Sequence, residues 1–287
     1  MRKFYLQNEK AERIALNAEN GIALADPSGL GVEYKRTYAS VGDGFFNLVN
    51  TDEKQATPRG TLIFMTDPYN QYVQLTEWIA QAQELLLIYA PENTEYYRRV
   101  DVNVLSKTEM GEGTWMEVPI TFACKTPWYL PVPVNLIFNS STENNIVYPF
   151  RWTPQLKYTA GVGGAFTATI TPRGQIEGSI KLMFTGSIIN PSITLTGLQT
   201  GTVYGQANIT ASFNIGDTLE LMTSKSGSYI QKVAADGTIT DLINFINVST
   251  EPFFKIPLSE QTIIEIESNN EIVGEATAEL YFYYRTV

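Results

Sequence analysis

The sequence predicts a mainly β protein, with an N-terminal β-sandwich-like domain that contains one α-helix and a C-terminal β-sandwich of the jelly-roll type. Most periodic segments alternate apolar and polar residues at every second position, which is the pattern of strands with one buried face. Only one segment shows the spacing of an amphipathic helix. After residue 154 the chain has many short strand patterns, separated by Gly, Asn or Asp turns, which favours an antiparallel sandwich.

The predicted helix covers residues 69–84. Asp67 and Pro68 precede it and suit the N-cap and the first helical position. Its apolar stripe consists of Tyr72, Leu75, Ile79 and Ala82. Strands are predicted over residues 85–90 and 96–107, the second with Val100, Val102 and Val104 on one side. The first domain is therefore mainly β with one helix.

The predicted strands of the second domain show clearer alternation. Apolar positions recur at Ile180, Leu182 and Phe184, at Ile209, Ala211 and Phe213, at Leu219 and Leu221, at Ile264 and Ile266, and at every second residue from Ala276 to Tyr284. The turn at residues 214–217 predicts a hairpin between the segments at 209–213 and 219–221. These segments predict one buried face per strand.

The domain boundary is indicated by composition. The proline-rich residues 126–133 cannot form a central strand, and residues 139–145 are polar throughout. We therefore place a linker within residues 127–150, with domains at 1–147 and 148–287. Glycines at 161–164 lack the Gly-Lys-Ser/Thr sequence of a phosphate loop and predict a hairpin tip instead.

Composition excludes several function classes. Hydrophobic residues make up 44% of the 287 residues and charged residues 17%, a balance typical of a packed core. The chain has no histidine and one cysteine, Cys124, so Ser-His-Asp and Cys-His catalysis, a zinc site and an internal disulfide are excluded. We predict no catalytic residues, no cofactor and no metal.

The net charge is −10, with 12 basic and 18 acidic residues up to residue 150 and 8 and 12 after it. Such an even acidity offers no basic footprint for gripping nucleic acid. The N-terminal residues do not resemble a signal peptide, and the longest apolar run, residues 85–90, is too short to span a membrane. We expect a soluble protein with no membrane partner.

Two side-chain groups leave alternatives open. Glu265 and Glu267 project from one strand face at a spacing compatible with a glycosidase pair, although alternating glutamates are the ordinary way to keep an exposed sheet soluble. Tyr281 and Tyr283 could stack on sugar rings, or serve as sheet pairs or interface anchors. The helix stripe most simply packs on the sheet; a second hypothesis is that Trp78, on its flank, faces a neighbouring subunit.

The order of segments in the first 130 residues resembles the distal tail protein family of siphophages, the phages with long non-contractile tails. The segments that carry the resemblance are residues 2–6, 26–31, 41–46, 58–64, the helix, 87–89, 96–100, 119–122 and 126–129. In the second domain the resemblance rests on residues 186–191, 216–217 and 272–274 with the following aromatic strand. That domain looks like the galectin-like sandwich of the family.

The resemblance implies a structural role in the virion, at the phage tail tip, after assembly in the cytoplasm of the bacterial host. Six copies would form a baseplate hub ring that joins the major tail tube protein to the tail-associated lysin or tip protein, and in many phages also carries receptor-binding proteins. DNA would pass through the lumen without specific binding. We name Tyr72, Trp78 and Ile79 as candidate ring-interface residues; the alternatives are a carbohydrate-binding adhesion module acting through the C-terminal sandwich and, more weakly, a glycosidase.

Overall fold

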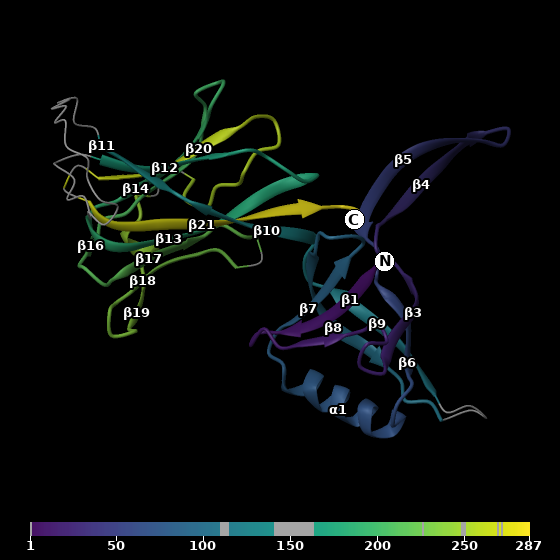
Figure 1. Cartoon of the computed structure of the whole chain (residues 1–287). Coiled ribbons are helices and arrows are strands. Elements are labelled where there is room, and N and C mark those ends of the chain that lie inside the picture. The colour runs from purple at the N-terminus through teal and green to yellow at the C-terminus, as the bar shows by residue number, and fades with distance from the viewer. Residues whose placement is uncertain are drawn as a thin grey trace. The chain divides into compact units, whose positions relative to one another are not determined.

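The computed structural model describes residues 2–109, 115–140, 164–225, 227–247, 251–268, 270 and 272–287. The chain divides into two units (Figure 1). The first unit comprises Met1–Leu130 and Tyr284–Val287, and the second comprises Pro131–Tyr283. This division falls within the predicted linker range. The predicted boundary between residues 147 and 148, and the glycines at 161–163, lie outside the described residues and stay predictions.

The first unit is a run of antiparallel strands with one helix. Its elements are β1 (Lys3–Asn8), β2 (Arg13–Ala15), β3 (Ile22–Ser28), β4 (Val32–Gly42), β5 (Phe45–Gln55), β6 (Arg59–Phe64), α1 (Pro68–Gln81), β7 (Leu85–Ala90), β8 (Tyr96–Leu105), β9 (Met116–Cys124) and β10 (Trp128–Asn135), which continues into the second unit. The pairing order is β2-β1-β7-β8-β9-β6-β3, while β4 and β5 pair only with each other. The core consists of alternate residues of these strands, including Leu6, Leu62, Phe64, Leu87, Phe122 and Trp128.

Helix α1 confirms the predicted helix and corrects its ends. Leu75 is buried, and Tyr72, Trp78, Ile79 and Ala82 pack against the core from the same side of the helix. The helix ends at Gln81 rather than at residue 84. Asp67 occupies the N-cap position in a left-handed conformation, but its side chain makes no capping bond and instead accepts a hydrogen bond from Nδ2 of Asn70 at 2.6 Å.

Strand β8 shows one local error of the sequence prediction. Val100 is fully buried and Val102 half-buried, as the alternation predicts, but Val104 is 41% exposed. The pairing of β8 with β9 shifts by one residue between Val102 and Val104. Such a bulge turns the following side chain away from the face that alternation assigns to it.

The second unit is a sandwich of two antiparallel sheets. One sheet has the order β19-β18-β17-β13-β21 with β16 beside β13, and the other has the order β11-β12-β20-β14-β15. The elements are β11 (Ile137–Ser140), β12 (Gly164–Ile170), β13 (Ile176–Ile189), β14 (Ser192–Gly197), β15 (Val203–Asn208), β16 (Ser212–Phe213), β17 (Thr218–Met222), β18 (Tyr229–Val233), β19 (Ile239–Asp241), the 3-10 helix η1 (Ile243–Phe245), β20 (Thr262–Ser268) and β21 (Val273–Tyr284). Phe166 of one sheet meets Phe184 of the other, with ring centroids 5.6 Å apart. The predicted fold class is confirmed.

Most predicted core positions of the second unit are buried, but one predicted hairpin does not form. Phe184, Leu221 and Ile266 lie in the core as expected. The segments at 209–213 and 219–221 were expected to pair with each other. Instead β16 pairs with residues 188–189 of β13 and β17 pairs with residues 181–185, so both lie beside one long strand. Gly216, with φ of 95°, lies in the turn between them.

The last four residues contribute to the first unit, although the sequence predicts them as the end of a second-domain strand. The ring of Tyr284 meets that of Tyr96 edge-on, with centroids 5.2 Å apart. Arg285 Nη1 lies 3.2 Å from Oε2 of Glu53. Both ends of the chain therefore supply residues to the same unit.

A carboxylate holds the turn between β14 and β15. Glu260 is buried, and its Oε2 accepts hydrogen bonds from the backbone N–H groups of Gln199 and Thr200 at 3.0 and 3.1 Å. Its Oε1 accepts hydrogen bonds from the hydroxyls of Thr200 and Tyr204, both at 2.6 Å. The hydroxyl of Thr200, then that of Tyr204, then the two N–H groups lower the pKa of Glu260 to about 2.

The stability that Glu260 contributes should therefore depend on pH. Because the folded-state pKa lies below the ordinary value of 4.5, the contribution is present above that value and is lost as the pH falls through about 2. We expect Glu260→Gln to lower the melting temperature of the second unit at neutral pH, and the difference from wild type to shrink near pH 2. Calorimetry at several pH values measures this. Glu267→Gln, on an exposed residue, is the control, and a pH-independent difference for Glu260→Gln would contradict the account.

Candidate subunit-contact site

The most prominent surface feature of the first unit is a two-stranded arm, which we define as residues 32–55. Figure 1 shows β4 and β5 leaving the body of the unit as a long hairpin. Gly42 pairs with Phe45, so Asp43 and Gly44 form a two-residue loop. Their φ values of 47° and 80° are those of a type I′ turn, for which Asp-Gly is a preferred sequence. The hairpin is therefore encoded locally.

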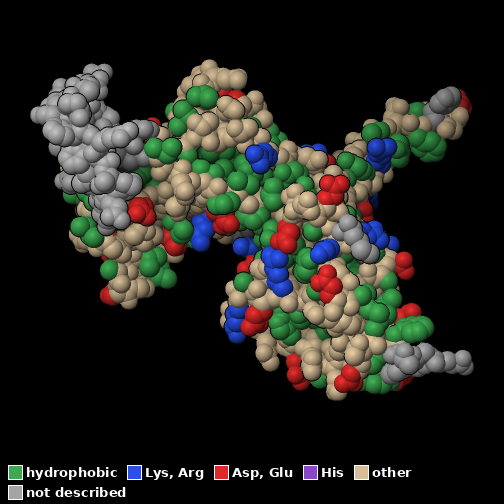
Figure 2. All heavy atoms as spheres, in the orientation of Figure 1, with side chains coloured by type: hydrophobic (Ala, Val, Ile, Leu, Met, Phe, Trp, Pro, Cys, Tyr) green, Lys and Arg blue, Asp and Glu red, His purple; other side chains and the backbone are tan. Residues whose placement is uncertain are grey.

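The register of the arm places four of its large apolar side chains on one face, while the exposed Val41 and Val49 lie at the two register shifts. Directly paired residues of two strands project to the same side, and so do residues two apart along a strand. Tyr38 pairs with Leu48, Ser40 pairs with Phe46, and Tyr34 lies four residues from Tyr38. We call the four residues Tyr34, Tyr38, Phe46 and Leu48 the apolar face of the arm. Their exposed fractions are 53%, 52%, 64% and 53%, and Figure 2 shows hydrophobic side chains on the surface of the arm.

The opposite face of the arm is polar over residues 33–37 and 50–54. Glu33 pairs with Lys54, Lys35 pairs with Asp52, and Thr37 pairs with Asn50. Opposite charges at directly paired positions stabilise a ribbon that water surrounds. The arm is thus amphipathic, and in the described chain β4 and β5 pair only with each other. An isolated hairpin is at best marginally stable in water, so this composition indicates a surface that binds another surface.

The root of the arm is fixed to the core by buried polar groups. Arg98 is fully buried; its Nε donates a hydrogen bond to the carbonyl of Thr126 at 3.0 Å, and its Nη1 donates one to that of Ala56 at 3.4 Å. Its guanidinium lies 5.3 Å from the centre of the Trp128 ring. Trp128 Nε1 in turn donates to the carbonyl of Leu30 at 2.9 Å. Arg98 and Trp128 therefore hold the chain on both sides of the arm.

Burial lowers the pKa of Arg98, although the charge of a Cys124 thiolate would raise that pKa. The root is also fixed by a close approach of the backbone at Gly29. Gly29 has φ of 73°, and a Cβ at this position would lie 1.9 Å from the carbonyl oxygen of Thr57. The two strands that lead into the arm thus approach each other more closely than any residue with a side chain permits.

The three predicted interface residues lie on the inner side of α1. Tyr72 donates its hydroxyl hydrogen to the carbonyl of Leu105 at 3.2 Å, and its ring meets that of Phe64 edge-on. Trp78 and Ile79 are half-buried against the core. Their role in a ring interface stays a prediction.

The solvent side of α1 carries a stripe that the sequence prediction missed. Tyr69, Val73 and Glu77 follow one another at intervals of four residues, which places them on one face of the helix. Tyr69 is 40% and Val73 49% exposed. The Tyr69 hydroxyl donates to Oε2 of Glu109 at 2.9 Å, and Nζ of Lys107 lies 5.0 Å from the centre of the Tyr69 ring. We call these three residues the outer stripe of α1.

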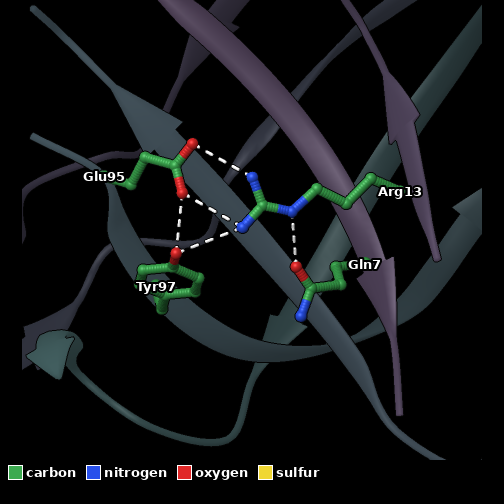
Figure 3. A network of polar contacts seen from close by, with 4 residues as sticks. All are labelled: Gln7, Arg13, Glu95 and Tyr97. Carbon is green, nitrogen blue, oxygen red and sulfur yellow. Dashed lines mark hydrogen bonds and ion pairs between the residues drawn. The ribbon is translucent and has the colours of Figure 1, made fainter. Parts of the chain in front are cut away.

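A network of polar side chains ties the edge strand β2 to its neighbours (Figure 3). Arg13 donates from Nη1 and Nη2 to the two carboxylate oxygens of Glu95 at 3.0 and 3.1 Å, and from Nε to Oε1 of Gln7 at 2.6 Å. Tyr97 donates its hydroxyl hydrogen to Glu95 at 2.6 Å. Partial burial raises the pKa of Glu95, but the hydrogen bonds from Tyr97 and Arg13 outweigh it and lower the pKa. The network therefore joins β2 to β1 and to the start of β8 and has a structural role.

The groups considered for sugar chemistry lie on sheet surfaces of the second unit. Glu265 is half-buried and Glu267 is exposed on β20, and burial, followed by the charge of Glu267, raises the pKa of Glu265. Tyr281 and Tyr283 are half-buried rather than exposed, which corrects the sequence interpretation. Tyr281 donates its hydroxyl hydrogen to Glu279 at 2.6 Å, and the Tyr283 hydroxyl lies 2.8 Å from that of Ser179. Both tyrosine hydroxyls therefore lie within hydrogen-bonding distance of side chains of the same sheet.

Within the described residues, no three His, Cys, Asp or Glu side chains gather in a way that could hold a metal ion. No helix in that part of the chain is long and apolar enough to cross a membrane.

Solved structures of phage baseplate and hub proteins are similar in fold to this chain. A chain of the phage P2 baseplate in its activated conformation with calcium matches with a TM-score of 0.66 at 14% identity, over 100% of both chains. The same baseplate with strontium gives a TM-score of 0.65 at 14% identity, again over 100% of both chains. The Dit protein of SPP1, described as a paradigm of the hub adsorption apparatus in phages that infect Gram-positive bacteria, matches with a TM-score of 0.58 at 10% identity, over 97% and 98% of the two chains.

A match to a known family covers most of the first unit. Residues 3–125 match the family model described as the N-terminal domain of the distal tail protein. The first unit is therefore similar to the N-terminal domain of distal tail proteins. None of the curated proteins matches the sequence.

Proposed function

We propose that this protein forms a six-membered ring at the tip of a phage tail, as a structural part of the virion assembled in the host cytoplasm. The ring joins the major tail tube protein on one side to the tail-associated lysin or tip protein on the other, and it is a platform for receptor-binding proteins. The observation that carries the proposal is the match of residues 3–125 to distal tail proteins. The exposed apolar face of the arm supports self-association, because covering it with a second surface removes apolar side chains from water, which is favourable.

The chemistry of the chain supports a role without catalysis. Histidine is missing from the whole sequence, and Cys124 is half-buried with a pKa that burial raises, which disfavours the reactive thiolate. The chain performs its task through shape and assembly. The net charge of −10 supports passage of DNA through the ring, because a predominantly acidic protein has little electrostatic attraction for phosphates.

The mass of the purified full-length protein tests the ring. We expect native mass spectrometry over a range of concentrations to show a species of six times the 32.0 kDa chain, and negative-stain images to show rings. A chain that stays monomeric at every concentration, alone and with its tube and tip partners, would contradict the proposal. A closed ring with a different number of copies would correct the number and leave the structural role.

A further inference from the structure

The arm and helix α1 lie at opposite ends of the first unit. The arm leaves beside Arg59, whose Cα pairs with that of Ser28, at the first residue of β6. Helix α1 follows the last residue of that strand, Phe64. In Figure 1 the arm points away from α1. The apolar face of the arm is therefore available to another molecule rather than to the helix of its own chain.

From this arrangement we propose that the apolar face of the arm docks on the outer stripe of α1 in a second copy of this chain. Each copy then offers an arm at one end and a helix at the other. Two different surfaces that fit each other generate a head-to-tail contact, which closes into a ring when the rotation between copies allows it. The inference rests on the proposed ring and names the surfaces that form it.

The two surfaces match in length and in order. On the arm, Arg36 lies between Tyr34 and Tyr38 on the apolar face, and four residues separate Arg36 from Ser40, the partner of Phe46. At about 3.4 Å per residue this is roughly 14 Å. On α1, eight residues separate Tyr69 from Glu77, which is about 12 Å along a helix. From Arg36 toward the tip the apolar face ends in the ring of Phe46, and from Glu77 toward the start of the helix the outer stripe ends in the ring of Tyr69.

The charges at these ends are opposite. Arg36 and Glu77 are both exposed, and within the described part of the chain neither is held in an ion pair. Other charges nearby do have partners: Glu53, on the same face as Arg36, pairs with Arg285. Docking the arm with Arg36 toward Glu77 leaves Tyr38, Phe46 and Leu48 over Tyr69 and Val73.

The area of the contact suits a repeated interface. A large aromatic side chain presents about 200 Å², so four half-exposed side chains offer on the order of 400 Å² of surface per arm. This is small for a stable dimer, which typically buries about 800 Å² on each partner. In a ring each copy would use the contact twice, once through its arm and once through its helix. The contact that closes the ring forms between copies that are already joined, so it costs no further translational freedom.

A charge exchange tests the contact in the full-length chain. We expect Arg36→Glu and Glu77→Arg each to weaken assembly about tenfold or more, because like charges then meet, and the double variant to return to within a few-fold of wild type. Lys35→Glu, one residue away but on the polar face, is the matched control and should change assembly less than threefold. Native mass spectrometry over a dilution series measures all four proteins, and circular dichroism checks their folding.

The outcomes separate this contact from the ring itself. Rescue in the double variant supports the contact. If both single variants form rings that dissociate on dilution like the wild-type ring, the contact is overturned and the proposed function stays in place. The same holds if the single variants assemble more weakly and the double variant does not restore assembly. A wild-type chain that never assembles overturns both.

Discussion

Arg98→Met should lower the free energy of unfolding of the first unit by about 3–5 kcal/mol. Methionine fills a similar volume but donates no hydrogen bond, so the carbonyls of Thr126 and Ala56 lose their buried donor. An unsatisfied buried acceptor costs about 1–3 kcal/mol, and the contact of the guanidinium with Trp128 is lost as well. For a unit of this size we expect the melting temperature to fall by roughly 10 °C.

The neighbouring arginine provides the matched control. Arg99 is partly exposed and pairs with Glu84 at 2.5 Å, and a surface ion pair of this kind is worth at most about 1 kcal/mol. Arg99→Met should therefore have a small effect. Differential scanning calorimetry of the three proteins makes the comparison. Equal melting temperatures for Arg98→Met and wild type would show that the buried guanidinium does not hold the root of the arm.

Removing two side chains from the apolar face of the arm is expected to dissociate the ring and leave a folded monomer. The double change Tyr38→Ser with Leu48→Ser removes two half-exposed side chains that we place in the contact between copies. Full burial of such a side chain contributes about 1.5–3 kcal/mol, so half of this for each gives about 2 kcal/mol per contact. That corresponds to a roughly 30-fold weaker contact, repeated at every interface.

The polar face of the arm supplies the control for this experiment. Thr37→Ser with Asn50→Ser changes a directly paired set one position away, on the side that we leave in solvent. Sedimentation velocity should show the control as a ring and the apolar-face variant as a monomer with an unchanged melting temperature. If both doubles assemble like wild type, the apolar face has another partner, and if both dissociate, the whole hairpin rather than one face makes the contact.

Sequence alternation predicted the buried positions of a strand well where the strand is regular and has one face toward a core. Phe184, Leu221 and Ile266 sit on buried faces because each strand has one side toward a core. The alternation failed at Val104, where a bulge in the pairing with β9 reverses the face. It also failed for the pairing of β16 and β17, because the choice of partner strand depends on β13 and not on the turn between them.

The candidate contact site was largely invisible to such reasoning. The arm has a local signal, the Asp43-Gly44 turn between two β-rich segments, but a strand that is covered and a strand that projects into solvent have the same alternation. The outer stripe of α1 was missed for a related reason. Tyr72, Trp78 and Ile79 form the more apolar side of the helix, and that side packs on the core of its own unit.

The sequence by itself determined the mainly β class, the position of the single helix and the likeness to distal tail proteins, because these depend on patterns within short segments. Only the tertiary structure decided which of two adjacent arginines is buried. Arg98 and Arg99 look equivalent in the sequence, but Arg98 shares the core face of β8 with Val100 and lies against Trp128. Burial depends on what the rest of the chain brings to that face, and this is a property of the packed fold.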